Sequence, residues 1–121
     1  MKKSKLIPIP KLIKKTEKIF NEWIRERDKN LGCISCGGNV DHCGHYFPTN
    51  YSGVRFYEIN CNGQCIKCNN YLSGNLIFYR RGLIQKYGNE MIEQLETYAI
   101  ETRKKKWERD ELNSIISKYK K

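Results

Sequence analysis

The chain has 121 residues, of which 39% are hydrophobic and 30% are charged, and its formal net charge is +10 at pH 7. This length favours one domain with a modest core, and small cores often depend on a bound metal for stability. No apolar run approaches the length of a transmembrane helix, and the basic start lacks the apolar centre of a signal peptide. We therefore expect a cytoplasmic protein with no membrane partner.

The positive charge is concentrated at the two ends of the sequence. Residues 1–30 contain ten Lys and Arg against four acids, and residues 76–121 contain eleven against seven, whereas residues 31–75 contain two of each. A neutral centre between basic arms is typical of a protein that binds a polyanion. A polyanion such as nucleic acid is favoured over a membrane surface, because no strongly amphipathic face of aromatic and basic residues dominates.

Helices are predicted on both sides of the neutral centre. A basic N-terminal arm and helix occupies residues 1–31, with hydrophobic residues at helical spacing over 11–28. Pro8 and Pro10 should keep the residues before that helix extended. A helical extension occupies 76–121. The helices predicted there cover 75–88, 89–107 and 108–121.

The central segment, residues 32–75, is rich in Gly, Asn, Cys and Tyr. Two alternating stretches, 40–47 and 54–59, predict short strands joined by the loop PTNYSG. A helix is predicted to begin near Cys65, with an interruption at LSGN where Asn75 would cap the next helix. The sequence therefore predicts an α+β fold, with a strand–loop–strand–helix core and flanking α-helices.

Two CxxC pairs, separated by 28 residues, enclose this core. Each pair can place both sulfurs on one tetrahedral Zn²⁺ ion, whereas disulfides or inert thiols are the alternative that a reducing cytoplasm disfavours. We therefore predict a structural zinc site formed by Cys33, Cys36, Cys65 and Cys68. Cys43 and Cys61 lie outside this set and are predicted to be small buried residues.

His45, Asn60 and Asn69 fall where the predicted hairpin and the following helix would meet. A neutral imidazole can take a proton from water near pH 7, so His45 is the candidate general base for hydrolysis of a phosphodiester. A divalent cation would neutralise the developing charge, and the side-chain carbonyl of Asn69 is a ligand that Mg²⁺ accepts. A structural, hydrogen-bonded histidine is the alternative for His45.

The motifs CISCGG, GHYFP and RFYEINCNGQCIKCNNYLSGNLIFYRRGLI resemble the NinG/Rap recombination nucleases of lambdoid and related phages, over about residues 17–88. The His, Asn and Asn arrangement resembles the wider HNH, or His-Me finger, superfamily. The resemblance implies a zinc-tied ββα-metal core with one catalytic divalent metal. It further implies a structure-specific DNA endonuclease that acts on D-loops and Holliday junctions in a bacterial host cytoplasm. In such a site, Asn60 would hold the ligand-bearing loop and orient the His45 ring.

One position departs from the superfamily pattern. Many HNH enzymes carry a metal-ligating Asp just before the base histidine, and this sequence has Gly44 there. His42 shares the strand face of residue 44, about 6.6 Å away, whereas Asp41 shares the face of His45. His42 is therefore the candidate replacement ligand, which would shift the preference from Mg²⁺ toward Mn²⁺. The alternative is that His42 is a bystander.

Three basic residues in or near the core, Arg55, Arg80 and Arg81, are candidate phosphate contacts, although each could equally be a solvated charge. Two symmetric cuts at a four-way junction would suit a homodimer formed through the flanking helices. Two other functions stay open from the sequence. One is a non-catalytic zinc-ribbon module that binds nucleic acid, and the other is an HNH nuclease that cuts ordinary duplex DNA.

Overall fold

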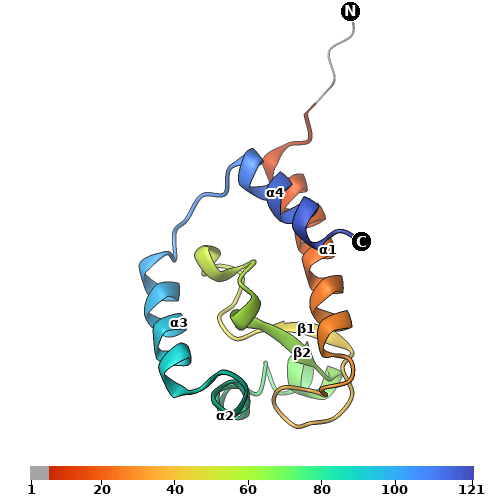
Figure 1. Ribbon diagram of the computed structural model, residues 1–121, viewed down its shortest axis with the longest axis vertical. Helices are drawn as coiled ribbons and strands as arrows, with labels where there is room; N and C mark the ends of the chain where they lie inside the picture. Colours follow the sequence, from red (N-terminus) through yellow and green to blue (C-terminus); the bar gives the residue numbers. More distant parts are fainter. Residues whose placement is uncertain (1–5) are drawn as a thin grey trace, which may run out of the picture.

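The computed structural model describes residues 6–121, so Met1–Lys5 of the predicted basic arm lie outside the described residues. The elements are α1 (Ile9–Asp28), β1 (His42–His45), β2 (Cys61–Gln64), α2 (Leu76–Tyr87), α3 (Asn89–Glu101) and α4 (Arg109–Tyr119). In Figure 1, α1 and α4 lie side by side, and the β1–β2 hairpin lies between this pair and α2 and α3. The predicted α+β class is confirmed at this level, as a mostly helical fold with a small antiparallel sheet.

Helix α1 confirms the helix predicted over 11–28, but it begins at Ile9, so that Pro10 lies in its first turn. Proline fits this place because the first N–H groups of a helix have no partner within it. One face of α1 packs against α4 and the hairpin. The buried residues recur every four positions, at Leu12, Thr16, Phe20, Ile24 and Asp28.

The second predicted strand, at 54–59, is wrong. These residues belong to a loop with two 3-10 turns, Ser52–Val54 and Glu58–Asn60, and the real strand follows as β2. Val54 and Phe56 alternate with polar residues because they enter two different hydrophobic cores, not because they line one face of a sheet. Strand β2 has the sequence CNGQ and is fully buried, so its polar residues gave no hydrophobic pattern to detect.

Two hydrophobic cores stabilise the two ends of the molecule. The first joins α1 to α4 through residues that include Phe20 and Leu112. The second joins α2 to α3 through residues that include Tyr79 and Ile92. The buried hydroxyl of Tyr79 also donates a hydrogen bond of 2.8 Å to the carbonyl of Gly44, which ties the second core to β1.

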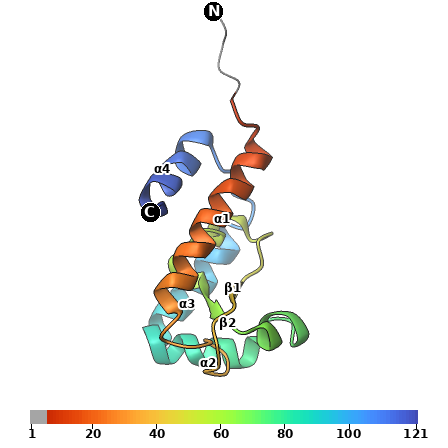
Figure 2. The same ribbon diagram turned by 90° about the vertical axis from the view of Figure 1, so that its right-hand side faces the viewer.

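The helix predicted to begin near Cys65 is a short π-helical turn, η3 (Lys67–Tyr71), which Figure 2 shows projecting from one side of the hairpin. The predicted interruption follows it, and α2 begins with Asn75 at the N-cap position. However, the backbone of Asn75 is left-handed, at φ 46°, and its side chain does not cap the helix. Its amide donates to Cys68 Sγ instead, at 3.5 Å.

The helix predicted over 89–107 ends early, at Glu101. The carbonyl of Thr102 instead accepts the N–H of Gly53 at 3.1 Å, and a Cβ on that glycine would lie 1.9 Å from the Thr102 hydroxyl. The other two helices predicted after residue 75 are confirmed as α2 and α4. Within residues 6–121, no helix has both the length and the apolar character needed to cross a membrane.

Candidate functional site

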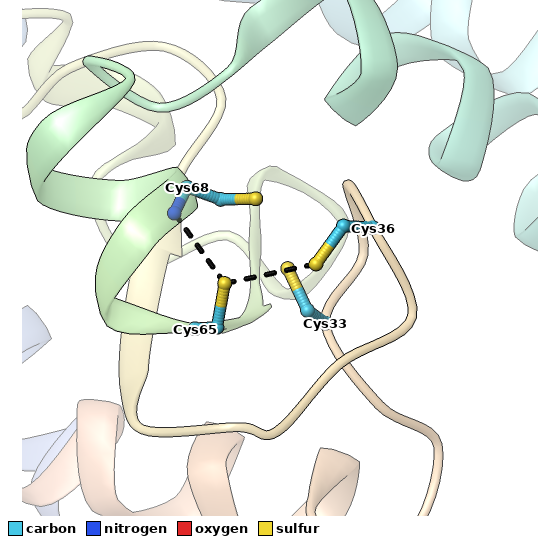
Figure 3. Close-up of side chains that lie close together, drawn as sticks. All are labelled: Cys33, Cys36, Cys65 and Cys68. Atoms are coloured by element: carbon cyan, nitrogen blue, oxygen red, sulfur yellow. Dashed lines mark hydrogen bonds between the residues drawn. The ribbon is translucent and has the colours of Figure 1, made fainter.

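Four cysteine sulfurs converge between the first CxxC loop and η3, as Figure 3 shows. The sulfur atoms all lie within 4.8 Å of one another, and Cys36 Sγ is 3.7 Å from Cys65 Sγ. Zn–S bonds of about 2.3 Å in a tetrahedron require sulfurs about 3.8 Å apart, so this group fits one Zn²⁺ ion. The ligands brought together are the predicted ones, Cys33, Cys36, Cys65 and Cys68.

Three N–H groups surround these sulfurs as hydrogen-bond donors. The backbone N–H of Gly38 donates to Cys36, that of Cys68 donates to Cys65, and the Asn75 amide donates to Cys68, at 3.4–3.5 Å. Such donors stabilise thiolates and orient them toward a metal. A zinc ion bound here would tie the loop at residue 33 to η3, and thereby fix the segment that carries Asn69.

His45 lies on the face of the hairpin that is turned toward α1. Its Nε2 is 3.1 Å from the backbone carbonyl of Arg55, which can only accept a hydrogen bond, so Nε2 carries the proton and Nδ1 keeps its lone pair. Burial lowers the pKa of His45 below its ordinary value, and it outweighs the carbonyl contact that raises it. The ring is therefore neutral at pH 7 and has one nitrogen able to accept a proton.

Asn60 is fully buried and holds the loop between the two strands. Its Oδ1 accepts the N–H of Phe47 at 2.8 Å, and its Nδ2 donates to the carbonyls of Phe47 and Val54 at 3.1 and 3.2 Å. Val54 directly precedes Arg55, whose carbonyl accepts the hydrogen bond from the His45 ring. Among the described residues, no hydrogen bond joins Asn60 to that ring. Asn60 therefore positions His45 indirectly, through the loop and through its own carbonyl, which accepts the N–H of Tyr46 at 2.9 Å.

His42 and Asn69 lie together on the other face of the hairpin. The Nδ1 of His42 is 3.1 Å from the side-chain Nδ2 of Asn69, and both residues are half-buried. Register places His42 opposite Gln64 and His45 opposite Cys61, so the two histidines point to opposite sides of β1. The structure thus brings together the two predicted metal ligands and separates them from the predicted base.

Gly44 directly precedes His45, and Gln64 occupies the space above it. A Cβ at residue 44 would lie 1.9 Å from Gln64 Oε1, so no side chain fits without moving that glutamine. Gln64 is fully buried, and its Nε2 donates to Ser35 Oγ at 2.9 Å and to the Gly74 carbonyl at 2.7 Å. Its Oε1 has no hydrogen-bond partner in the described part of the chain. We did not predict this residue from the sequence, because the misplaced second strand hid its position opposite His42.

The three candidate phosphate contacts differ in their surroundings. Arg55 is paired with Glu17, and Arg80 forms two hydrogen bonds to Glu96 at 2.9 and 3.0 Å. Arg81 is exposed, lies 5.2 Å from the Phe78 ring centre, and has no acidic partner within residues 6–121. Only Arg81 therefore presents a charge that no neighbouring carboxylate neutralises.

This chain is similar to known proteins along almost its whole length. The family model described as "Bacteriophage Lambda NinG protein" matches residues 1–121. Protein ninG of Escherichia phage 933W and that of Escherichia phage lambda are each 37% identical to this chain, and that of Salmonella phage P22 is 35% identical, over 98% of this chain in each case. The chain spans 59–60% of the length of these relatives. No solved structure matches. The chain belongs to the NinG family.

Proposed function

We propose that this chain contains the core of a metal-dependent DNA endonuclease of the HNH type, with His45 as the general base. The observation that carries the proposal is the state of the His45 ring. It is neutral, its Nε2 proton is directed to the Arg55 carbonyl, and its Nδ1 is available to accept a proton from water. The fully buried Asn60 side chain donates a hydrogen bond to the carbonyl of Val54 and thereby fixes the loop that carries the Arg55 carbonyl.

The pair formed by His42 and Asn69 would hold the catalytic cation. The contact between the two side chains joins Asn69 Nδ2 to His42 Nδ1, so binding of the cation would require the Asn69 amide to turn its carbonyl oxygen toward the ion that a ring nitrogen of His42 also binds. An oxygen and an imidazole together suit Mn²⁺, and Mg²⁺ with water ligands is the other candidate. A cation bound there supplies charge neutralisation at the phosphate and at the leaving oxygen. Gly44 has no side chain that could bind the cation, and His42 lies two positions away on the same face of β1.

His45 and the proposed cation site lie on opposite faces of β1, and this arrangement suits an in-line attack. In such a displacement, the attacking water and the leaving oxygen lie on opposite sides of the phosphorus atom. In the described residues, β1 is paired only with β2, so its other edge is free. A scissile phosphate at this edge would have His45 on one side and the cation site on the other.

The substrate is proposed to be branched DNA at recombination intermediates, such as D-loops and Holliday junctions. The net charge of +10 supports a polyanionic partner, and Arg81 provides an exposed cation beside the first CxxC loop. The preference for branches rests on the resemblance to NinG/Rap nucleases. A homodimer that makes two symmetric cuts in the bacterial host cytoplasm completes the proposal.

The test compares the parent protein with His45→Ala and His42→Ala on linear duplex, flap and four-way junction DNA, with Mg²⁺ or Mn²⁺. We expect His45→Ala to lose cleavage by about 10²–10⁴-fold, the usual contribution of a general base, while zinc content and helicity are retained. His42→Ala should weaken the dependence on Mn²⁺ and leave junction binding intact, because His42 contacts Asn69 and not the basic arms.

Two results would overturn the proposal. Cleavage by His45→Ala at the parental rate would exclude His45 as the base. Junction binding without cleavage in any divalent metal would favour the zinc-ribbon binding module. Equal cleavage of linear duplex and junction would retain the nuclease and remove the branch preference.

A further inference from the structure

A second group of metal-binding side chains lies outside the four-cysteine cluster. The sulfurs of Cys43 and Cys61 and a ring nitrogen of His45 lie within 4.8 Å of one another, the same criterion that the zinc cluster meets. Cys61 is fully buried, whereas Cys43 and His45 are half-buried, so the group can be reached from solvent on one side. Both cysteines are free thiols.

The strand register brings these three residues to one face. His45 pairs with Cys61 across the hairpin, and Cys43 is two positions along β1 from His45, so all three point toward α1. The carbonyl of Arg55 lies beside them, 3.1 Å from His45 Nε2 and 3.5 Å from Cys61 Sγ. The cluster is therefore held by the same loop that positions the proposed base.

The chemistry of this group matches a soft cation. Two thiolates neutralise the charge of one Zn²⁺ ion, which favours a net-neutral site on a half-buried face. Tetrahedral Zn–S and Zn–N bonds require donor atoms about 3.6–3.8 Å apart, so donors within 4.8 Å need to close by about 1 Å at most. Hard cations such as Mg²⁺ take oxygen ligands and would not bind here.

We propose that Cys43, His45 and Cys61 form a second, exchangeable site for Zn²⁺ or a similarly soft metal ion, and that occupation of this site blocks His45. A neutral imidazole has a single lone pair, so a metal bound at either ring nitrogen of His45 leaves none to take a proton from water. The blocking of cleavage rests on the proposed function, whereas the binding of the metal does not.

The two zinc sites should differ in lifetime. The first has four sulfur ligands and connects two chain segments, so it is closed and structural. The second has three ligands and a fourth position open to water, as in zinc sites that exchange their ligands. Weak chelation should therefore remove the second metal and leave the first.

The test is zinc stoichiometry, measured by native mass spectrometry on the full chain during titration with ZnCl₂. We expect the parent protein to bind two Zn²⁺ per chain, and Cys43→Ser to bind one. The half-buried Cys43 is the better site to change, because Cys61 lies in the first core. Cys61→Ser, which keeps a hydroxyl near the Arg55 carbonyl, serves as the second variant. Circular dichroism and retention of one zinc show that each variant folds.

Cleavage assays in Mg²⁺ or Mn²⁺ test the blocking of His45. Added Zn²⁺ should inhibit the parent by about a hundredfold, the contribution expected of a general base, and should inhibit Cys43→Ser much less. A parent protein that binds a single Zn²⁺ in excess metal, or a folded Cys43→Ser that still binds two, overturns the site. Binding of the second Zn²⁺ without inhibition overturns the blocking of His45. The zinc stoichiometry can be measured whether or not the protein cleaves DNA. A chain that is inactive as a nuclease would therefore contradict the proposed function, and the stoichiometry would still test the second zinc site.

Discussion

The two faces of the β1–β2 hairpin have different environments. One face consists of His42, Gly44, Asn62 and Gln64, and the other consists of Cys43, His45, Cys61 and Gly63. On the first face, the buried Gln64 amide forms hydrogen bonds to Ser35 and Gly74, in the loops next to the four-cysteine cluster. On the second face, the two cysteines belong to the apolar core of α1 and α4. We therefore expect the proposed metal ligands to depend on zinc binding at the four-cysteine cluster, and the proposed base to depend on helix packing.

Loss of the structural zinc is the largest change that this comparison predicts. Cys68→Ser, or removal of zinc by a strong chelator, should unfold η3 and separate Asn69 from His42, because structural Zn²⁺ contributes about 10–16 kcal/mol to such sites. Backbone amides in α1 should keep more protection from hydrogen exchange than those of η3. Cys43→Ser is the matched control, since it removes a thiol without touching the cluster. Equal loss of protection on both faces would contradict the comparison.

Replacement of Asp28 should give the next largest effect, because this residue joins the end of α1 to β2. Asp28 is 1% exposed, accepts the N–H of Gly63 at 2.8 Å, and pairs with Arg27 and Lys86. Asp28→Asn leaves two partly buried cations without a carboxylate, so the free energy of unfolding should fall by about 3–5 kcal/mol. Urea denaturation measures it. Glu26→Gln, which breaks an exposed pair with Lys29, is the control and should change little.

The pH dependence of this effect follows from the pKa of Asp28. Burial alone would raise that pKa, but the hydrogen bonds from Arg27 and from the N–H of Gly63, together with the charges of Arg27 and Lys86, lower it below its ordinary value of 3.8. The stabilisation is therefore complete above pH 3.8 and is lost as the pH falls through the lowered value. The difference between the parent and Asp28→Asn should shrink over that acidic range.

Much of this organisation was predictable from the sequence, because the signals for it are local. The CxxC spacing predicted which four cysteines come together, and the helical spacing of α1 predicted its extent to within two residues at the start. Strand alternation also placed His42 and His45 on opposite faces. Each of these inferences needs only residues that are near one another in the chain.

Strand β2 was not predictable in this way, because its buried polar side chains form hydrogen bonds with residues that are distant in sequence. Asn62 is bonded to Tyr79 and Lys86, and Gln64 is bonded to Ser35, so polar side chains are buried without any apolar period. Misplacing β2 also hid the cluster of Cys61 with His45. The prediction that Cys61 is a small buried residue is confirmed. That Cys61 lies beside His45 could not be predicted without the strand register.

Gly44→Asp tests whether Gln64 fills the space that a side chain at residue 44 would need. A Cβ at residue 44 meets Gln64 Oε1 at 1.9 Å, so the single variant should lose about 1–3 kcal/mol of stability through overpacking. The double variant Gly44→Asp/Gln64→Ala should lose less than the sum of the two single variants, as expected for residues in contact. Thermal unfolding of the four proteins gives the coupling. Additive losses would show that the two side chains do not compete for this space.

Protonation of His45 should have the smallest effect on stability, and its sign is fixed by burial. Burial lowers the pKa of the folded state below that of the unfolded chain, so the unfolded chain binds more protons between the two values. The free energy of unfolding therefore falls as the pH drops below about 6.5, the ordinary value for histidine. His45→Gln should remove this slope while retaining a donor for the Arg55 carbonyl. Cleavage by the parent should decline at a lower pH, as the pH falls through the lowered pKa of His45 in the folded protein, because the protonated ring cannot act as a base. A slope that persists in His45→Gln would assign the titration to another group.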